Sequence, residues 1–163
     1  MSTVTATYIS QVTVVETFTG DFVGSDNTVT VDGLNNTTVL TASTTVPVTK
    51  QAAFAKALSS GTGTIDLTAL PGMTADETVN GTGLKVQVCK LANPAANANA
   101  ITVAKGASSG YAMIGSSFTI TLQPGQEHTF YLNDAAPDIG SGAKNLDLTG
   151  TGTQALDVLF VMG

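Results

Sequence analysis

Apolar and polar residues alternate through residues 3–18, the first segment of the chain. The even positions carry Val4, Ala6, Tyr8, Val12, Val14 and Phe18, whereas the odd positions carry Thr3, Thr5, Thr7, Gln11, Thr13 and Thr17. A period of two with one apolar face predicts a half-buried β-strand. If fully extended, the segment would span roughly 50 Å, well beyond an ordinary strand of about 5–6 residues. The strand therefore either bends near Ser10 and Gln11 or forms an arm that lies across a neighbouring subunit.

Two more strands are expected before residue 60, at 28–31 and 37–46, because Asp, Gly or Asn residues flank each of them. Residues 49–60 are rich in alanine, and Phe54 and Leu58 would lie one turn apart on a helix. We expect a short helix or connector there. It would separate an N-terminal β segment or arm, residues 1–60, from a main domain, residues 61–163.

The main domain is predicted to be a regular series of short strands and turns. Strands are expected at 62–68, 84–91, 100–105, 110–114, 117–123, 126–132, 145–149 and 155–162. One of the turns is Pro124-Gly125, where proline presets the first corner and glycine accepts a positive φ at the second. This density of turns predicts an all-β fold, an antiparallel β-sandwich or a jelly-roll-like domain.

The last predicted strand, 155–162, is apolar on both faces. Leu156, Val158, Phe160 and Met162 make one face, and Leu159 and Val161 make the opposite face apolar as well. Such a strand is either central beneath a covering layer or placed at a subunit interface. Because few helices are predicted that could cover it, we favour a subunit interface at Leu159 and Val161.

Composition and charge exclude several classes of protein. Charged residues are only 11% of the 163 residues, the formal net charge is −6, and no arginine occurs. Nucleic-acid binding is disfavoured, because phosphate contacts need clustered Lys and Arg. Threonine is the most frequent residue, and plentiful Val, Leu and Ile at low charge argue against disorder.

The compartment is expected to be the cytoplasm of the producing cell. The sequence starts without a basic segment followed by an apolar one, so no secretory signal is predicted. An apolar run near 18 residues is also missing, and we therefore expect no contact with a membrane. The single cysteine, Cys89, cannot form an internal disulfide, which fits a reducing environment.

Candidate chemistry is sparse. The only histidine, His128, and Cys89 each fall within a predicted strand, so packing roles are favoured over a Ser/His/Asp or Cys/His catalytic site. Residues 21–26 and 133–138 contain carboxylates that suit Ca²⁺. Neither segment has the alternating acidic pattern of an EF-hand loop, so turn formation is the favoured interpretation. We expect no catalysis, no metal and no cofactor.

A carbohydrate-binding module is the hypothesis from a different functional class. Sugar platforms stack pyranose rings on exposed aromatic side chains. The chain has no tryptophan, and its only tyrosines are Tyr8, Tyr111 and Tyr131. A glycan-binding or adhesion β-sandwich remains an alternative.

The stretch from Gly61 to Gly163 resembles the β-sandwich head decoration (cement) proteins of tailed bacteriophages. The resemblance lies in pattern and composition and is carried by residues 64–68 (TIDLT), 100–104 (AITVA), 120–125 (ITLQPG), 146–152 (LDLTGTG) and 156–161 (LDVLFV). Other virion parts, such as neck, tail and fibre proteins, share this style. Residues 1–60 have no counterpart in the resemblance.

The resemblance implies a structural protein that decorates and stabilises a bacteriophage capsid. Its partners would be the major capsid protein and further copies of itself, with a homotrimer favoured and a dimer possible. Its location would be the outer surface of the capsid in the virion. In this hypothesis the N-terminal segment is a capsid-contacting arm, whose apolar contacts are made by Val4, Tyr8, Val12 and Val14. An ordered arm on many repeated copies would convert modest contacts into avidity.

Overall fold

The structure is a computed structural model that describes residues 3–18, 27–72, 74 and 77–163. All regular elements in this part of the chain are β-strands, which confirms the predicted all-β class. The chain divides into two compact units. One is formed by the residues through Ala6 together with Leu40–Gly163, and the other by Thr7–Val39.

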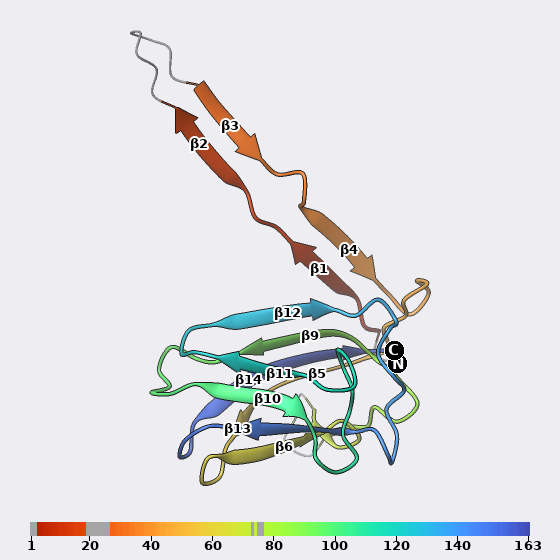
Figure 1. Cartoon of the computed structure of the whole chain (residues 1–163). Helices are drawn as coiled ribbons and strands as arrows, with labels where there is room; N and C mark the ends of the chain where they lie inside the picture. The colour runs from red at the N-terminus through yellow and green to blue at the C-terminus, as the bar shows by residue number, and fades with distance from the viewer. Residues whose placement is uncertain (1–2, 19–26, 73, 75–76) are drawn as a thin grey trace. The chain divides into compact units, whose positions relative to one another are not determined.

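The larger unit contains two four-stranded antiparallel sheets (Figure 1). The sheet called here the β14 sheet has the order β12 (Glu127–Tyr131), β9 (Val86–Ala92), β14 (Ala155–Met162) and β5 (Lys50–Ala57). The second sheet, the β10 sheet, has the order β11 (Thr119–Leu122), β10 (Ile101–Lys105), β13 (Asn145–Thr149) and β6 (Thr62–Asp66). Among these eight strands, only β10 and β11 are consecutive in the chain and also paired with each other. Every other connection crosses to the opposite sheet. A two-residue pair, β7 (Leu70–Pro71) and β8 (Thr78–Val79), lies between β6 and β9 in the chain.

The core is built from the inward-facing side chains of both sheets. Leu156, Val158 and Phe160 alternate along β14 and are at most 4% exposed, and Ile101 and Val103 of β10 are fully buried. All five belong to one continuous cluster. Burying a side chain of this size contributes about 1.5–3 kcal/mol relative to exposing it. The alternation of apolar residues therefore fixes which side of each strand faces the opposite sheet.

Most of the predicted strands of the main domain are present, with ends shifted by a few residues. The exception is 110–114, where Gly110 forms only an isolated bridge and Tyr111 is buried in a loop. The Pro124-Gly125 turn is confirmed. Gly125 has a φ of 82°, and the Gln126 amide donates to the Gln123 carbonyl at 2.9 Å. This turn carries the chain from β11 in one sheet to β12 in the other.

The helix expected at 49–60 is wrong, and so is the domain boundary after residue 60. Lys50–Ala57 is strand β5, which pairs with β14 from Met162 to Ala155. Alanine favours helices by less than 1 kcal/mol per residue, and pairing along a whole strand outweighs that preference. Phe54 packs with its ring centroid 6.5 Å from that of Phe160, so β5 is part of the sandwich.

The smaller unit is a two-stranded antiparallel ribbon, called here the ribbon, which is inserted into the sandwich sequence. β1 (Ala6–Ser10) pairs with β4 (Asn36–Leu40), and β2 (Val14–Phe18) pairs with β3 (Asn27–Val31). The long N-terminal strand is interrupted at residues 11–13, directly after the predicted bend. There the Val12 amide donates to the Asn35 side-chain oxygen at 2.8 Å. The strand expected at 37–46 ends at Leu40, and Thr44 then closes a turn by donating to the Thr41 carbonyl at 2.8 Å.

Candidate interaction surfaces

The first candidate surface is the outer face of the β14 sheet, opposite the core. Strand registry arranges its central positions in rows that cross the sheet. Leu159 of β14 is paired with Lys90 of β9 on one side and Ala53 of β5 on the other. In the next row, Asp157 is paired with Ala92 and Ala55. These side chains point away from the core, because their neighbours along β14, Val158 and Phe160, belong to it.

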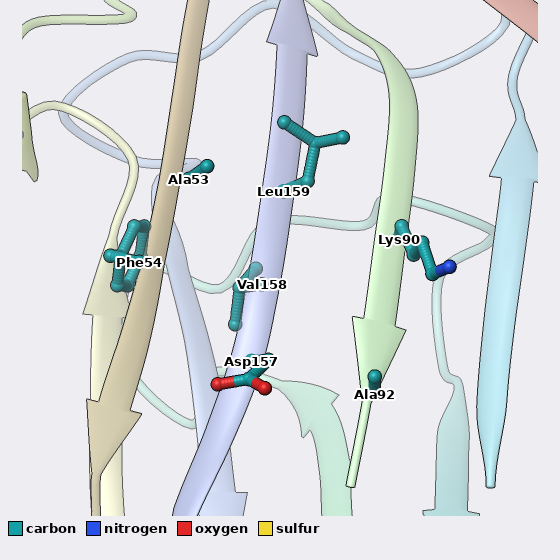
Figure 2. A pocket seen from close by; sticks show the side chains of 7 residues that line it. All are labelled: Ala53, Phe54, Lys90, Ala92, Asp157, Val158 and Leu159. Carbon is teal, nitrogen blue, oxygen red and sulfur yellow. The ribbon is translucent and has the colours of Figure 1, made fainter. Parts of the chain in front are cut away.

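A shallow hollow of about 300 Å³ lies on this face around Leu159. Figure 2 shows the residues that line it, which come from the three adjacent strands β5, β14 and β9: Ala53, Phe54, Lys90, Ala92, Asp157, Val158 and Leu159. The lining is mainly apolar, with one ammonium and one carboxylate at its edges. Leu159 is half-buried and Asp157 is exposed. The hollow is therefore an apolar depression bordered by one charge of each sign.

The charged groups on this face are already partly organised. The Lys90 ammonium lies 2.9 Å from the Glu127 carboxylate of β12, and both side chains are substantially exposed. An exposed pair of this kind contributes about 0–1 kcal/mol. Lys90 consequently remains available to a further carboxylate.

The other end of the same face is covered by the chain itself. Val161 is 5% exposed and its register partner Val88 is 7% exposed, yet neither belongs to the core cluster. Three other residues share this combination of burial and absence from the cluster: Leu40, Val46 and Val48. The Thr49 amide donates to the Met162 carbonyl at 2.8 Å, which brings segment 40–48 to the Val161 end of β14. Val161 is therefore apolar for a reason within one chain, and a subunit-interface prediction on this strand depends on Leu159.

The second candidate surface is the ribbon. Within the described residues, all the exposed large hydrophobic side chains except Ile114 lie in it: Ile9, Val12, Val14, Val15, Val29, Val31, Leu34 and Val39. Val14 is the direct cross-strand partner of Val31, so these two side chains share a face. Both are more than 50% exposed. A two-stranded ribbon cannot bury either face by itself, and isolated ribbons are marginally stable in water.

The proposed arm residues fall into two groups. Val12 and Val14 are 75% and 52% exposed and are available to a partner. Tyr8 is half-buried, and Val4 is half-buried in the larger unit rather than in the ribbon. The ribbon sequence between Thr7 and Val39 contains four acidic residues and no lysine, so it is an apolar and anionic segment.

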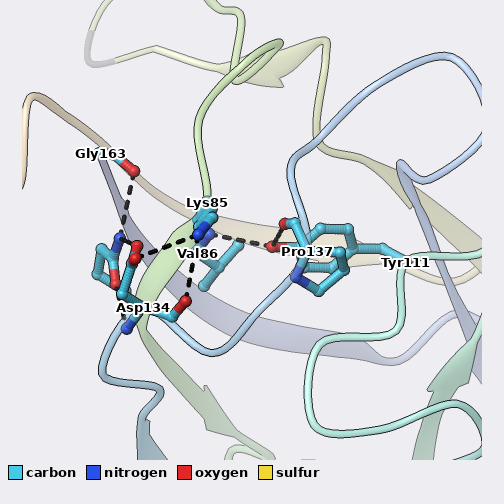
Figure 3. Close-up of polar contacts among 7 residues, drawn as sticks. Lys85, Val86, Tyr111, Asp134, Pro137 and Gly163 are labelled. Atoms are coloured by element: carbon cyan, nitrogen blue, oxygen red, sulfur yellow. Dashed lines mark hydrogen bonds and ion pairs between the residues drawn. The ribbon is translucent and has the colours of Figure 1, made fainter. Parts of the chain in front are cut away.

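A polar cluster joins β9 to the loop that follows β12 (Figure 3). Gln87 is fully buried and donates to the Asp134 carboxylate at 3.1 Å and to the Gly163 carbonyl at 3.2 Å. The Lys85 ammonium lies 3.1 Å from the same carboxylate. Hydrogen bonds from Gln87 and Lys85 hold the pKa of Asp134 below its usual range. Asp134, one of the carboxylates considered for calcium, is thus a structural anchor.

The described part of the chain, which includes segment 133–138, holds no cluster of three potential metal ligands. The other candidate segment, 21–26, lies outside the described residues. Cys89 is fully buried in the core, and burial raises the pKa of its thiol. His128 is exposed on edge strand β12, with its ring 6.0 Å from that of Phe130. Cys89 is therefore shielded from water, whereas His128 is accessible to it.

The three tyrosines do not share one surface. Tyr111 is fully buried, with its hydroxyl donating to the Pro137 carbonyl at 2.8 Å and accepting from the Val86 amide at 3.1 Å. Tyr8 lies in the ribbon, and Tyr131 lies on β12 with its hydroxyl 3.1 Å from the Asn133 side-chain oxygen. Tyr111 consequently cannot stack on a sugar.

Comparison with known proteins adds no relative. No family model, no curated protein and no solved structure matches the chain. The described residues contain no helix with the length and apolar character needed to cross a bilayer.

The sequence pointed to Leu159 and to Val12 and Val14 of the ribbon. It missed the other exposed valines of the ribbon, as well as Lys90, Asp157 and Gln87. Lys90 and Asp157 are distant in sequence and become neighbours only through the registry of β9 with β14. Gln87 stands between Val86 and Val88, and a polar residue inside an apolar strand was the available signal.

Proposed function

We propose that the protein is a structural component of a bacteriophage virion that decorates and stabilises the outer surface of the capsid. In this proposal the sandwich is the body of the decoration protein, and the ribbon is the arm that contacts the major capsid protein. The observation that carries the proposal is the concentration of exposed large hydrophobic side chains in the ribbon. Exposed apolar surface gathered in one element is typical of an interaction site.

The strand order of the sandwich supports a jelly roll. Numbered from one to eight along the chain, the strands of the β14 sheet lie in the order six, three, eight, one, and those of the β10 sheet in the order five, four, seven, two. This is the order produced by the two Greek keys of an eight-stranded jelly roll. Jelly rolls occur in viral capsid domains and in lectins, so the topology is compatible with a virion role. The burial of Tyr111 reduces the support for the glycan-binding alternative.

The arm assignment is supported by the chemistry of the ribbon. Val14, Val29 and Val31 share one face in the β2–β3 registry, while Val15 lies on the other face. An apolar, anionic ribbon fits a partner surface that has an apolar groove with neutral or basic borders. Many copies of such an arm on one shell would give strong attachment from individually modest contacts.

The test uses particles from the source of the gene and particles that lack this chain. Cryo-electron microscopy of the two samples is expected to differ by density on the outside of the head. Purified protein added back to the deficient particles should restore that density. Density on the tail or neck would favour another virion component, and absence of the chain from particles would overturn the proposal.

Matched variants locate the contact on the ribbon. Replacing Val14 and Val31 together by threonine removes apolar contact from one face and keeps residues that favour strands. We expect this double variant to lose most of its binding to deficient particles. Val15→Thr, on the opposite face, is the control and should bind like the unmodified protein. Equal binding by all three proteins would exclude the face that carries Val14 and Val31 as the capsid contact.

A further inference from the structure

We propose that the outer face of the β14 sheet is a self-association surface on which two copies of the chain form a two-fold dimer centred on Leu159 and Ala92. The inference rests on the proposed function in one respect, because many copies bound to one shell would meet at high local concentration. It replaces the trimer expected from the resemblance by a dimer, and it identifies the residues that meet.

The argument starts from four neighbouring positions on this face. Registry pairs Leu159 with Lys90 in one row and Asp157 with Ala92 in the next. The four positions form a parallelogram with two different diagonals. One diagonal joins two apolar residues, Leu159 and Ala92, and the other joins two opposite charges, Lys90 and Asp157. Figure 2 shows these side chains around the hollow.

A parallelogram of this kind is complementary to itself. Consider a two-fold axis that lies between two facing sheets and runs along the apolar diagonal. It sets Leu159 against Leu159 of the partner subunit and Ala92 against Ala92 of the partner subunit. The two diagonals cross at about 70°, so the axis also brings each end of the charged diagonal to within about 3 Å, in projection, of the other end's position. Lys90 therefore lies opposite Asp157 of the partner subunit, and the reverse pair forms at the same time. An isologous interface requires this reciprocity.

The geometry is compatible with known packing of sheets. Strands lie about 4.8 Å apart, and alternate residues on one strand lie about 6.8 Å apart, so the diagonal is inclined at roughly 35° to the strands. The strands of the two copies would cross at about twice that angle, roughly 70°, which is near the orthogonal class of sheet packing.

The residues around this surface also fit a second copy of the chain. Glu127 is the intrachain partner of Lys90 at 2.9 Å, and an ammonium has three donors, enough for both carboxylates. The Val88 and Val161 end is already buried by the chain itself. The contact must therefore be centred on the Leu159 and Ala92 end of the face, where the hollow lies.

The size of the surface sets the expected strength of association. Four strands and three rows of side chains cover roughly 400 Å², about half of the 800 Å² per partner typical of a stable complex. The dimer is accordingly a weak one in solution, and a high local concentration of copies on a shell would favour it. Measurements should extend from about 10 μM to about 1 mM, where weak interfaces of this size associate.

The test is sedimentation velocity on the full chain with charge-reversed variants. Glu127→Gln is introduced first, so that an acidic residue at position 90 does not face a second carboxylate. In this background, Lys90→Asp and Asp157→Lys are each expected to weaken the dimer at least tenfold. The combination of the two should restore it, because the pairs between copies are re-formed with reversed polarity. Lys105→Asp, a reversal on the β10 sheet, is the control and should leave the dimer unchanged.

The outcomes separate this inference from the proposed function. A monomer at all concentrations, a dimer or trimer that ignores the single reversals, or a failure of the combined variant to recover would each overturn the two-fold pairing. Thermal melting of each variant shows whether the sandwich remains folded. If the protein is monomeric but still binds deficient particles, the capsid role stands and the dimer is wrong. If the protein is dimeric and the combined variant restores the dimer, but the chain is absent from particles, the dimer stands and the capsid role is wrong.

Discussion

Gln87 and Asp134 are joined by two hydrogen bonds that run in opposite directions. The Gln87 side-chain nitrogen donates to the Asp134 carboxylate at 3.1 Å, and the Asp134 backbone amide donates to the Gln87 side-chain oxygen at 3.0 Å. The Gln87 nitrogen also reaches the Gly163 carbonyl. One buried amide therefore fastens the loop after β12 and the end of the chain to β9.

Replacing Gln87 by leucine is expected to lower the free energy of unfolding by about 1–3 kcal/mol. Leucine has a similar volume but leaves the Asp134 amide and the Gly163 carbonyl without these partners, and an unsatisfied buried polar group costs about that much. Urea denaturation followed by circular dichroism measures the change. Gln123→Leu, at an exposed position, should stay within about 0.5 kcal/mol of the unmodified protein. Similar losses in both variants would show that the hydrogen bonds of Gln87 do not stabilise the fold.

We expect ionisation of the buried Tyr111 to lower the stability of the protein in alkaline solution. Burial raises the pKa of Tyr111 to about 12, compared with about 10 in an unfolded chain. The folded state holds the phenolic proton more tightly, so this contribution is complete below about pH 10 and disappears as the pH rises towards 12. Tyr111→Phe should lose about 1–3 kcal/mol at pH 7, because the Val86 amide and the Pro137 carbonyl lose their partner.

Denaturation of both proteins at pH 7 and at about pH 11 tests this sign. The unmodified protein should lose more stability between the two pH values than Tyr111→Phe does. If both lose the same amount, ionisation of Tyr111 is not coupled to unfolding.

The sequence predicted strand positions well because alternation is a local property. Residues 145–149 and 155–162 show this most clearly, since the predicted and observed strands have the same bounds. The wrong prediction of a helix at 49–60 also comes from relying on a local pattern. The consecutive alanines Ala52 and Ala53 of β5 are the registry partners of Phe160 and Leu159, but from sequence alone the alanine-rich stretch indicated a helix.

What the sequence could not supply is the pairing of distant strands. The interpretation of Val161 shows the consequence. An apolar residue on the outer face indicated a second subunit, whereas Val161 is already buried within one chain. A segment more than a hundred residues earlier reaches the same end of β14, where the Thr49 amide donates to the Met162 carbonyl. The same long-range registry brings Lys90 and Asp157 onto one face. Neither the burial of Val161 nor the proximity of Lys90 to Asp157 can be recognised from the sequence of one strand.

Two glycines have left-handed backbone conformations, but only one of them is closely approached by other atoms. Replacing each by alanine therefore distinguishes the cost of backbone strain from the cost of steric overlap. Gly61 has a φ of 83°, and a Cβ there would lie 2.7 Å from the Gly150 carbonyl oxygen. Gly83 has a φ of 79°, but a Cβ there meets nothing within 4 Å. Gly83→Ala should therefore cost only the conformational strain, about 1–2 kcal/mol.

Gly61→Ala should cost that strain and a further 1–3 kcal/mol or so for overlap with a backbone that is itself hydrogen-bonded. The Gly61 amide donates to the Gly152 carbonyl at 2.7 Å, and the Gly150 amide donates to the Gly61 carbonyl at 2.8 Å, so this backbone cannot move freely. Thermal unfolding of the two variants gives the difference. A Gly61→Ala protein as stable as Gly83→Ala would mean that the turn relaxes without cost.

Cys89 is expected to report on opening of the sandwich. Its thiol is fully buried between the registry partners Phe130 and Phe160, and burial raises its pKa. Because the thiolate is the reactive form, a disulfide reagent such as 5,5′-dithiobis(2-nitrobenzoic acid) should not react with the native protein at neutral pH. In urea the reaction should become fast at the same concentration at which circular dichroism reports unfolding.

Substitutions at this position distinguish a packing role from a chemical one. Cys89→Ala should be tolerated better than Cys89→Ser, because serine buries a hydroxyl that costs about 1–3 kcal/mol without a partner. Rapid labelling of the native protein would contradict the buried environment, since it would require the core to open at the β9–β14 pair without global unfolding. Serine as stable as alanine would contradict it as well, because a hydroxyl is tolerated at no cost only where water or a partner reaches it.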